Sequence, residues 1–186
     1  MPPESGILRS TGFFRIPAAS LEKGLSRIIV PSMSHQTKGA GAIVLPERAE
    51  KVFAFGDHIT FHLTGKDTGG KYTLFTDIAP PGGGPPPHYH QNEDELFHVT
   101  EGRASFFYEG KWTEVPVGTS VFMPRGTIHS FKNVGETPLK LLIQTSPSGF
   151  ETFMTRCAAE FTKPGGPDMK RILEISAEHG IHFPQV

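Results

Sequence analysis

The chain has 186 residues, of which 37% are hydrophobic and 20% are charged, a composition typical of a folded domain rather than a disordered chain. Its length suits one well-buried core with tails better than two full domains. Eighteen basic residues against 19 acidic ones leave a net charge of -1, so no broad positive field exists to attract nucleic acid or anionic lipid. We therefore expect neither nucleic acid nor a membrane as a partner.

The expected compartment follows from the cysteine content and the absence of targeting signals. Cys157 is the single cysteine of the sequence, so no internal disulfide can form. The first residues show no basic segment leading into an apolar run, and no apolar stretch approaches the ~20 residues that a membrane-spanning helix needs. We expect a cytoplasmic protein.

Residues 1–45 contain several glycine and proline breakers and little hydrophobic periodicity, which indicates an N-terminal arm. Within this arm, Arg27 to Val30 could form an edge strand. Such a strand could cover the edge of its own barrel or pack on a partner subunit. The second arrangement leads us to expect a homodimer.

Residues 46–146 carry a strand pattern. Apolar and polar residues alternate over 59–63 and over 72–78, where Leu74, Thr76 and Ile78 share the face expected to be buried. The other expected strands are 95–101, 103–108, 111–115, 119–123, 128–132 and 139–145. Short strands separated by glycine and proline turns favour an all-β barrel or sandwich.

The pattern changes after Pro147. Residues 150–161 contain helix formers without a breaker, the run 164–167 interrupts them, and 168–179 has apolar residues on one face before Gly180. Two short helices are therefore expected in a C-terminal helical tail, residues 147–186.

Two histidines in the segment after the Pro/Gly run at 80–87 carry the first chemical signal. His88 and His90 are two residues apart, so on a strand their imidazoles leave the same face and can converge on one point. Glu95 would fall on the opposite face of an unbroken strand, but the polar run 91–94 indicates a turn that resets the phase. An isolated pair of this kind often lies on a solvated surface.

A second element downstream strengthens the case for a site. Here a strand, the turn Pro124-Arg125-Gly126 and a second strand place His129 just after the turn. In a barrel, that position could direct the imidazole back toward His88 and His90. Composition and spacing make a shared metal site plausible at this point and do not establish it.

These two segments resemble the signature motifs of the cupin family at every defined position. The first motif is matched by Gly82, His88, His90, Glu95 and Gly102, and the second by Gly118, Pro124, Gly126, His129 and Asn133. The resemblance covers roughly residues 50–146. It implies a double-stranded β-helix, or jelly-roll barrel, with an N-terminal arm and short C-terminal helices.

The cupin resemblance also implies that His88, His90, Glu95 and His129 hold one divalent transition metal ion. Imidazole and carboxylate ligands suit Fe, Mn, Ni, Co, Cu or Zn, and they do not identify which ion is bound. Four protein ligands would leave one or two coordination positions for substrate, water or dioxygen, which favours catalysis.

Other features make the chain similar to small single-barrel cupins of the quercetin 2,3-dioxygenase-like group. They are residues 63–70, the approach 84–88 to the first histidine, and the closing segments 148–161 and 178–181. The resemblance implies a dioxygenase for a small aromatic or enol-bearing compound, with Glu95 as the base that takes its proton. The alternatives are a non-redox isomerase or lyase and a metal-bearing binding protein without turnover.

The remaining polar and aromatic candidates have simpler interpretations. Glu93 and Asp94 are expected to be solvated, His98 to face outward, and Arg125 to be a solvated turn residue. Phe97 and Phe131 are expected in the barrel core, with a pocket-lining position as the alternative. The histidines outside both motifs are expected to be surface or hydrogen-bonded residues: His35, His58, His62, His179 and His182.

Overall fold

The computed structural model describes residues 41–184, which lie in one compact unit. The expected edge strand at Arg27 to Val30 and most of the expected arm lie outside the described residues. None of the helices in the described part of the chain is both long and apolar enough to cross a membrane.

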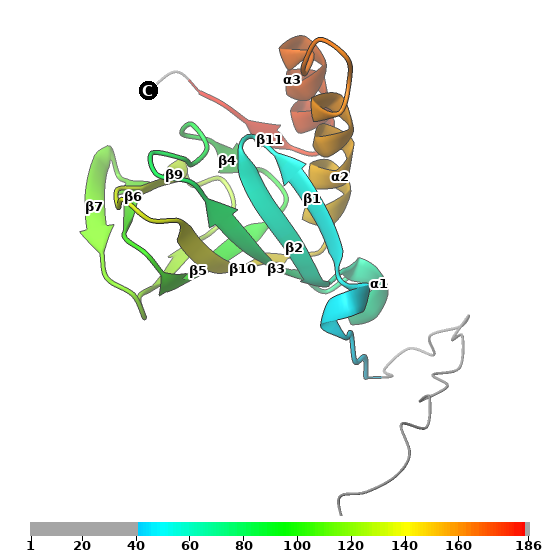
Figure 1. The fold of residues 1–186 in the computed structure, drawn as a ribbon, viewed down its shortest axis with the longest axis horizontal. Coiled ribbons are helices and arrows are strands. Elements are labelled where there is room, and N and C mark those ends of the chain that lie inside the picture. The colour runs from blue at the N-terminus through cyan, green and yellow to red at the C-terminus, as the bar shows by residue number, and fades with distance from the viewer. Residues whose placement is uncertain (1–40, 185–186) are drawn as a thin grey trace, which may run out of the picture. The chain divides into compact units, whose positions relative to one another are not determined.

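Antiparallel strands form two main sheets and confirm the all-β jelly roll (Figure 1). The six strands of the larger sheet, in spatial order, are β1 (Glu50–Ala54), β2 (Asp57–Leu63), β3 (Thr73–Ala79), β10 (Leu139–Ser146), β5 (Asp94–Glu101) and β8 (Ser120–Met123). The smaller sheet contains β7 (Lys111–Val115), β6 (Ala104–Tyr108) and β9 (His129–Asn133). The two-stranded sheet pairs β11 (Ile181–His182) with β4 (Tyr89–His90).

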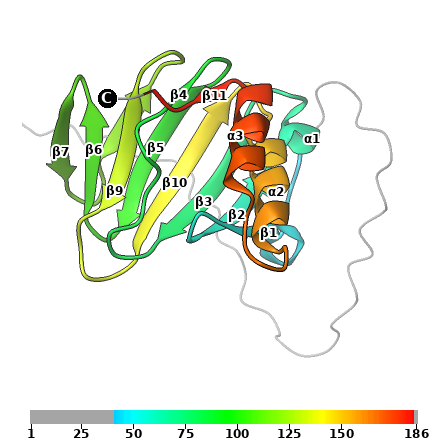
Figure 2. The same cartoon turned by 90° about the horizontal axis from the view of Figure 1, so that it is seen from above.

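The helices gather at one end of the barrel, beside β1 and away from β7 (Figure 2). They are the short helices η1 (Pro46–Arg48) and α1 (Gly65–Thr68) and the longer helices α2 (Phe150–Phe161) and α3 (Met169–Glu178). The side chain of Asp168 caps α3 by accepting hydrogen bonds from the backbone N–H groups of Lys170 and Arg171. Both expected C-terminal helices are therefore present.

Aromatic packing ties α2 to the barrel. Phe75 on β3 stacks on Phe150 at the start of α2, with ring centroids 5.0 Å apart, and it also contacts Phe61 at 5.8 Å. Aromatic rings bury large apolar areas, so this contact fixes the first turn of α2 over the barrel interior. The helical tail thus forms part of the wall around the interior.

The prediction of which face of β3 is buried is wrong. Thr73, Phe75 and Asp77 point inward and are buried, whereas Leu74 and Ile78, which were expected inside, lie half-buried on the other face. The prediction assumed that the more apolar face is the inner one. Here the inner face carries polar residues because it lines a cavity, so hydrophobic alternation alone selects the opposite face.

Candidate metal centre

Three histidines and one glutamate converge inside the barrel. His88 lies just before β4, His90 on β4, Glu95 on β5 and His129 at the start of β9. Each of the four is at most 8% exposed, and one ligand atom from each lies within 4.8 Å of all the others. The structure therefore brings together the four residues that the sequence motifs single out.

Backbone pairing explains why the two motifs meet. The N–H of His88 donates to the carbonyl of His129 over 2.9 Å, and the N–H of His129 donates to the carbonyl of His88 over 2.8 Å. In the second motif, the N–H of Gly126 donates to the carbonyl of His90 over 2.7 Å. The Pro-x-Gly turn is thus hydrogen-bonded directly to β4, the strand that carries His90.

Close approach of two backbones at Gly84 allows this pairing. Gly84 has φ +135°, and a Cβ atom placed there would lie 2.1 Å from the carbonyl oxygen of Phe131. A side chain cannot fit in that space, so only glycine lets the loop before His88 lie against β9. The glycine-rich approach is therefore part of what positions the site.

The histidine rings are oriented by backbone carbonyls. Nδ1 of His88 lies 3.0 Å from the carbonyl oxygen of Pro86, and Nδ1 of His129 lies 2.9 Å from that of Thr127. Because a carbonyl only accepts hydrogen bonds, each Nδ1 carries a proton, so in the neutral ring the lone pair is on Nε2. The neutral form of each ring is therefore the tautomer that can bind a metal through Nε2.

The contacts of Glu95 provide a test of whether a metal ion fits the site. Its Oε2 lies 3.0 Å from Nε2 of His129 and 3.3 Å from Nε2 of His90. The carboxylate oxygen can only accept, so its closeness to Nε2 of His129 requires either a proton on that nitrogen or a cation between the two atoms. The donor set fits one divalent transition metal ion.

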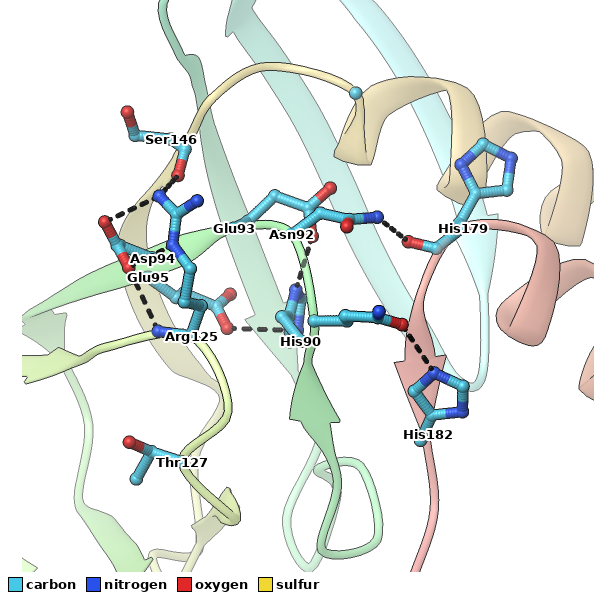
Figure 3. Close-up of polar contacts among 12 residues, drawn as sticks. His90, Asn92, Glu93, Asp94, Glu95, Arg125, Thr127, Ser146, His179 and His182 are labelled. Atoms are coloured by element: carbon cyan, nitrogen blue, oxygen red, sulfur yellow. Dashed lines mark hydrogen bonds and ion pairs between the residues drawn. The ribbon is translucent and has the colours of Figure 1, made fainter.

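Glu93 was expected to be solvated, and this expectation is wrong. Glu93 is 6% exposed, and its Oε2 lies 3.5 Å from Nδ1 of His90. Figure 3 shows Glu93 and Glu95 on either side of the His90 ring. A carboxylate behind a ligating imidazole orients it and raises its basicity, so Glu93 is placed to support His90.

Burial and mutual charge set the protonation of the centre. Burial, followed by repulsion from His129 and His90, lowers the pKa of His88 to about 3. Burial opposes charge on His90, but Glu95 and Glu93 outweigh it and raise its pKa. Burial likewise opposes charge on Glu95, but the three histidines outweigh it and lower its pKa. The charge of Glu95 therefore favours a cation at the centre, and binding of a metal ion there competes with protons for the same ring nitrogens.

Arg125 fastens the Pro-x-Gly turn to β5 from outside the site. Its guanidinium donates to both carboxylate oxygens of Asp94, each over 2.9 Å, and this lowers the pKa of Asp94 to about 2 (Figure 3). The Arg125 side chain is 49% exposed, as expected for a surface turn residue. On the outer face of β5, Nδ1 of His98 lies 2.9 Å from Oγ of Ser120, so His98 points outward as expected.

A cavity of about 400 Å³ extends from the candidate metal centre. His88, His90 and Glu95 lie in its wall. Phe97 and Phe131 also line it, so these two buried rings occupy the pocket-lining position that the sequence left as an alternative. The C-terminal tail contributes a second set of apolar side chains that sequence reasoning did not assign to the pocket: Phe150, Phe153, Met154, Ile172, Leu173 and Phe183. The apolar spacing 150, 153, 154 on α2 is the pattern that could have indicated this face.

Comparison with known proteins places the chain in a family. The sequence profile of the cupin domain matches residues 75–144. An oxalate-binding protein of Thermotoga maritima is 32% identical over 83 residues, which cover 44% of this chain and 69% of the relative. The chain belongs to the cupin family, as the sequence motifs predicted.

Other similarities are more partial. An uncharacterized protein of Methanocaldococcus jannaschii is 32% identical over 42% of this chain and 63% of its own length, so the chain spans less than two thirds of that relative. The polyketide synthase CurC of Streptomyces cyaneus is 29% identical over 38% of this chain and 46% of its own. The polyketide cyclase RemF of Streptomyces resistomycificus shares the fold at a TM-score of 0.51 and 22% identity, over 59% of this chain and 81% of that one.

Proposed function

We propose that this cupin is a mononuclear metal-dependent dioxygenase that acts on a small aromatic or enol-bearing compound. The observation that supports it best is a centre of three imidazoles and one carboxylate beside an aromatic-lined cavity of about 400 Å³. A pocket of this kind suits a small apolar ligand with a few polar groups. When bound, the metal ion supplies Lewis acidity and, if it is redox-active, the capacity to react with dioxygen.

The protein groups have distinct roles in this proposal. His88, His90 and His129 hold the metal ion through ring nitrogens. Glu95 completes the ligand set and, as the carboxylate of the centre, accepts the proton of the substrate's enol or phenol hydroxyl. Phe97 and Phe131 pack against the aromatic body and keep water from the reacting end.

The cavity wall argues against highly charged substrates. Across residues 41–184, neither lysine nor arginine lines this cavity. Phosphate and dicarboxylate groups are normally bound by such side chains. The wall therefore favours an uncharged aromatic compound over a sugar phosphate or oxalate.

A second candidate is a non-redox isomerase, lyase or cyclase, in which the same centre would act on an enol without consuming dioxygen. The apolar wall and the similarity to a polyketide synthase of Streptomyces cyaneus support it. A third candidate is a binding cupin without turnover, which the similarity to an oxalate-binding protein supports.

Oxygen uptake separates these candidates. Protein purified without added metal is analysed for metal content and then assayed with a panel of flavonols, enediols and diketones. We expect uptake in proportion to bound metal for at least one class, little uptake by His129→Ala, and normal uptake by the outward-facing control His98→Ala. Conversion of an enol without uptake would favour the isomerase, and binding without any conversion would favour the binding protein.

A further inference from the structure

Two aspartates outside both motifs lie in the cavity wall. Asp57 begins β2 and is 6% exposed, and Asp77 lies on β3 and is 7% exposed. The strand register pairs Ile59 with Asp77 and His58 with Ile78, so Asp57 is the diagonal neighbour of Asp77 on the inner face. Their two carboxyl groups therefore occupy one patch of the wall.

This acidic patch, Asp57 and Asp77, is separated from the candidate metal centre. Thr145 on β10 pairs with Thr73 on one side and with Glu95 on the other, so Asp77 lies two strands and four residues away from Glu95. On a flat sheet this would be roughly 16 Å between Cα atoms, and the inward curve of a barrel brings the two side chains close enough for the charge of Glu95 to act on Asp77. The acidic patch and the candidate metal centre line the same cavity.

The patch has no partner among the described residues. The Oδ1 atom of each aspartate is fully buried and makes no hydrogen bond with residues 41–184. The cavity wall described above holds no lysine or arginine that could neutralise the two carboxyls. A buried polar atom without a partner is costly and therefore often marks a functional role.

Two carboxyl groups this close in an apolar wall cannot both ionise readily. Burial raises the pKa of Asp57 to about 7 and, together with repulsion from Asp57 and Glu95, raises that of Asp77 well above its usual range. One of the two carboxyls can therefore stay protonated and donate a hydrogen bond, while the other carboxyl accepts one. A hydroxyl group, which also donates and accepts, is the complementary ligand.

We propose that Asp57 and Asp77 bind a hydroxyl group at the end of the substrate remote from the metal centre, so that the substrate is a hydroxylated aromatic compound. The inference rests on the proposed function, which identifies the end of the substrate that faces the metal centre. It assigns specificity, not bond chemistry, to the two aspartates. A second metal ion does not account for them, because they belong to no group of three or more potential metal-binding residues within 41–184.

The test measures a ratio of affinities for matched ligands. Flavonol and its derivative with one hydroxyl on the pendant ring are titrated into the full-length protein without oxygen, so that neither ligand is consumed. We expect the hydroxylated ligand to bind at least about tenfold more tightly, as for a hydrogen bond to a charged or buried carboxyl. Asp77→Leu should bring the ratio close to one, and Asp77→Asn, which still hydrogen-bonds, should restore part of it.

The cavity-wall control is Ile59→Val, which removes a methylene from the wall beside the two aspartates and should leave the ratio unchanged. Equal affinities in the wild type, no binding of either ligand, or a ratio that survives in Asp77→Leu would overturn the inference. Tighter binding of the matching amine would assign the patch to cations instead and would also overturn it. If the ratio behaves as expected but no compound supports oxygen uptake, the inference stands and the dioxygenase proposal fails.

Discussion

Replacing Asp57 by asparagine should stabilise the protein in a pH-dependent way. The folded state holds the pKa of Asp57 at about 7, against an ordinary value of 3.8, chiefly because burial disfavours the charged form. A difference of about three units corresponds to at most about 4 kcal/mol of lost stability once the carboxyl is ionised. Relief of the repulsion on Asp77 should add to the effect of the substitution.

The direction of the effect follows from proton uptake. Because the folded pKa is the higher one, the folded state binds more protons than the unfolded state between about pH 4 and 7. The penalty is absent below the ordinary pKa, grows as pH rises and is complete above the folded pKa. Asp57→Asn has no such group, so its advantage over the wild type should increase from pH 5 to pH 8.

Urea unfolding at pH 5, 6, 7 and 8 provides the measurement. We expect the difference in free energy of unfolding between Asp57→Asn and wild type to grow by about 2–4 kcal/mol over this range. Glu95, His88 and His90 also face the cavity, but they are present in both proteins and their contributions largely cancel in the difference. The exposed-residue control Glu136→Gln should show no such growth. Parallel pH profiles for wild type and Asp57→Asn would refute the reasoning.

Three further predictions concern the metal centre and assembly. Glu95→Gln should lose about 10²–10⁴-fold in turnover per bound metal, because the base is removed while three imidazoles remain; full metal with wild-type turnover would show that Glu95 is not the base. Glu93→Gln should weaken metal binding about 10–100-fold through His90, measured by competition with a chelator, whereas Asp94→Asn should not; equal affinities would contradict a supporting role. The solution mass should be near twice the 20.3 kDa of one chain, and a mass near one chain at micromolar concentration would rule out the homodimer.

Local patterns predicted most of the fold. The alternating runs between 59 and 145 place eight strands within two residues of their observed ends, because most of these strands have one buried face and each is bounded by a turn. Helix α2 matches the run 150–161, and the cap at Asp168 marks the start of α3. The two motifs single out four residues that the structure brings together, since their spacing reflects the strands and turn that carry them.

The features that were missed depend on tertiary packing. The inner face of β3 carries Asp77, so polarity pointed to the wrong side of that strand. The pairing of β11 with β4 joins Ile181 to His90, two residues that are distant in sequence and lie in two-residue strands too short for a periodic signal. The burial of Glu93 depends on the turn between β4 and β5 folding inward, which a polar run does not indicate.

X-ray absorption spectroscopy on protein purified without added metal tests the central claim most directly, because it reports both the element and its nearest atoms. We expect one transition metal ion per chain, with nitrogen and oxygen donors at about 2.0–2.3 Å and an imidazole signature of three rings. His129→Ala should lose one ring from that signature or lose the metal, and His98→Ala should be unchanged. A wild-type protein that binds no transition metal after equilibration with the candidate ions, or binds one without histidine donors, would contradict the account.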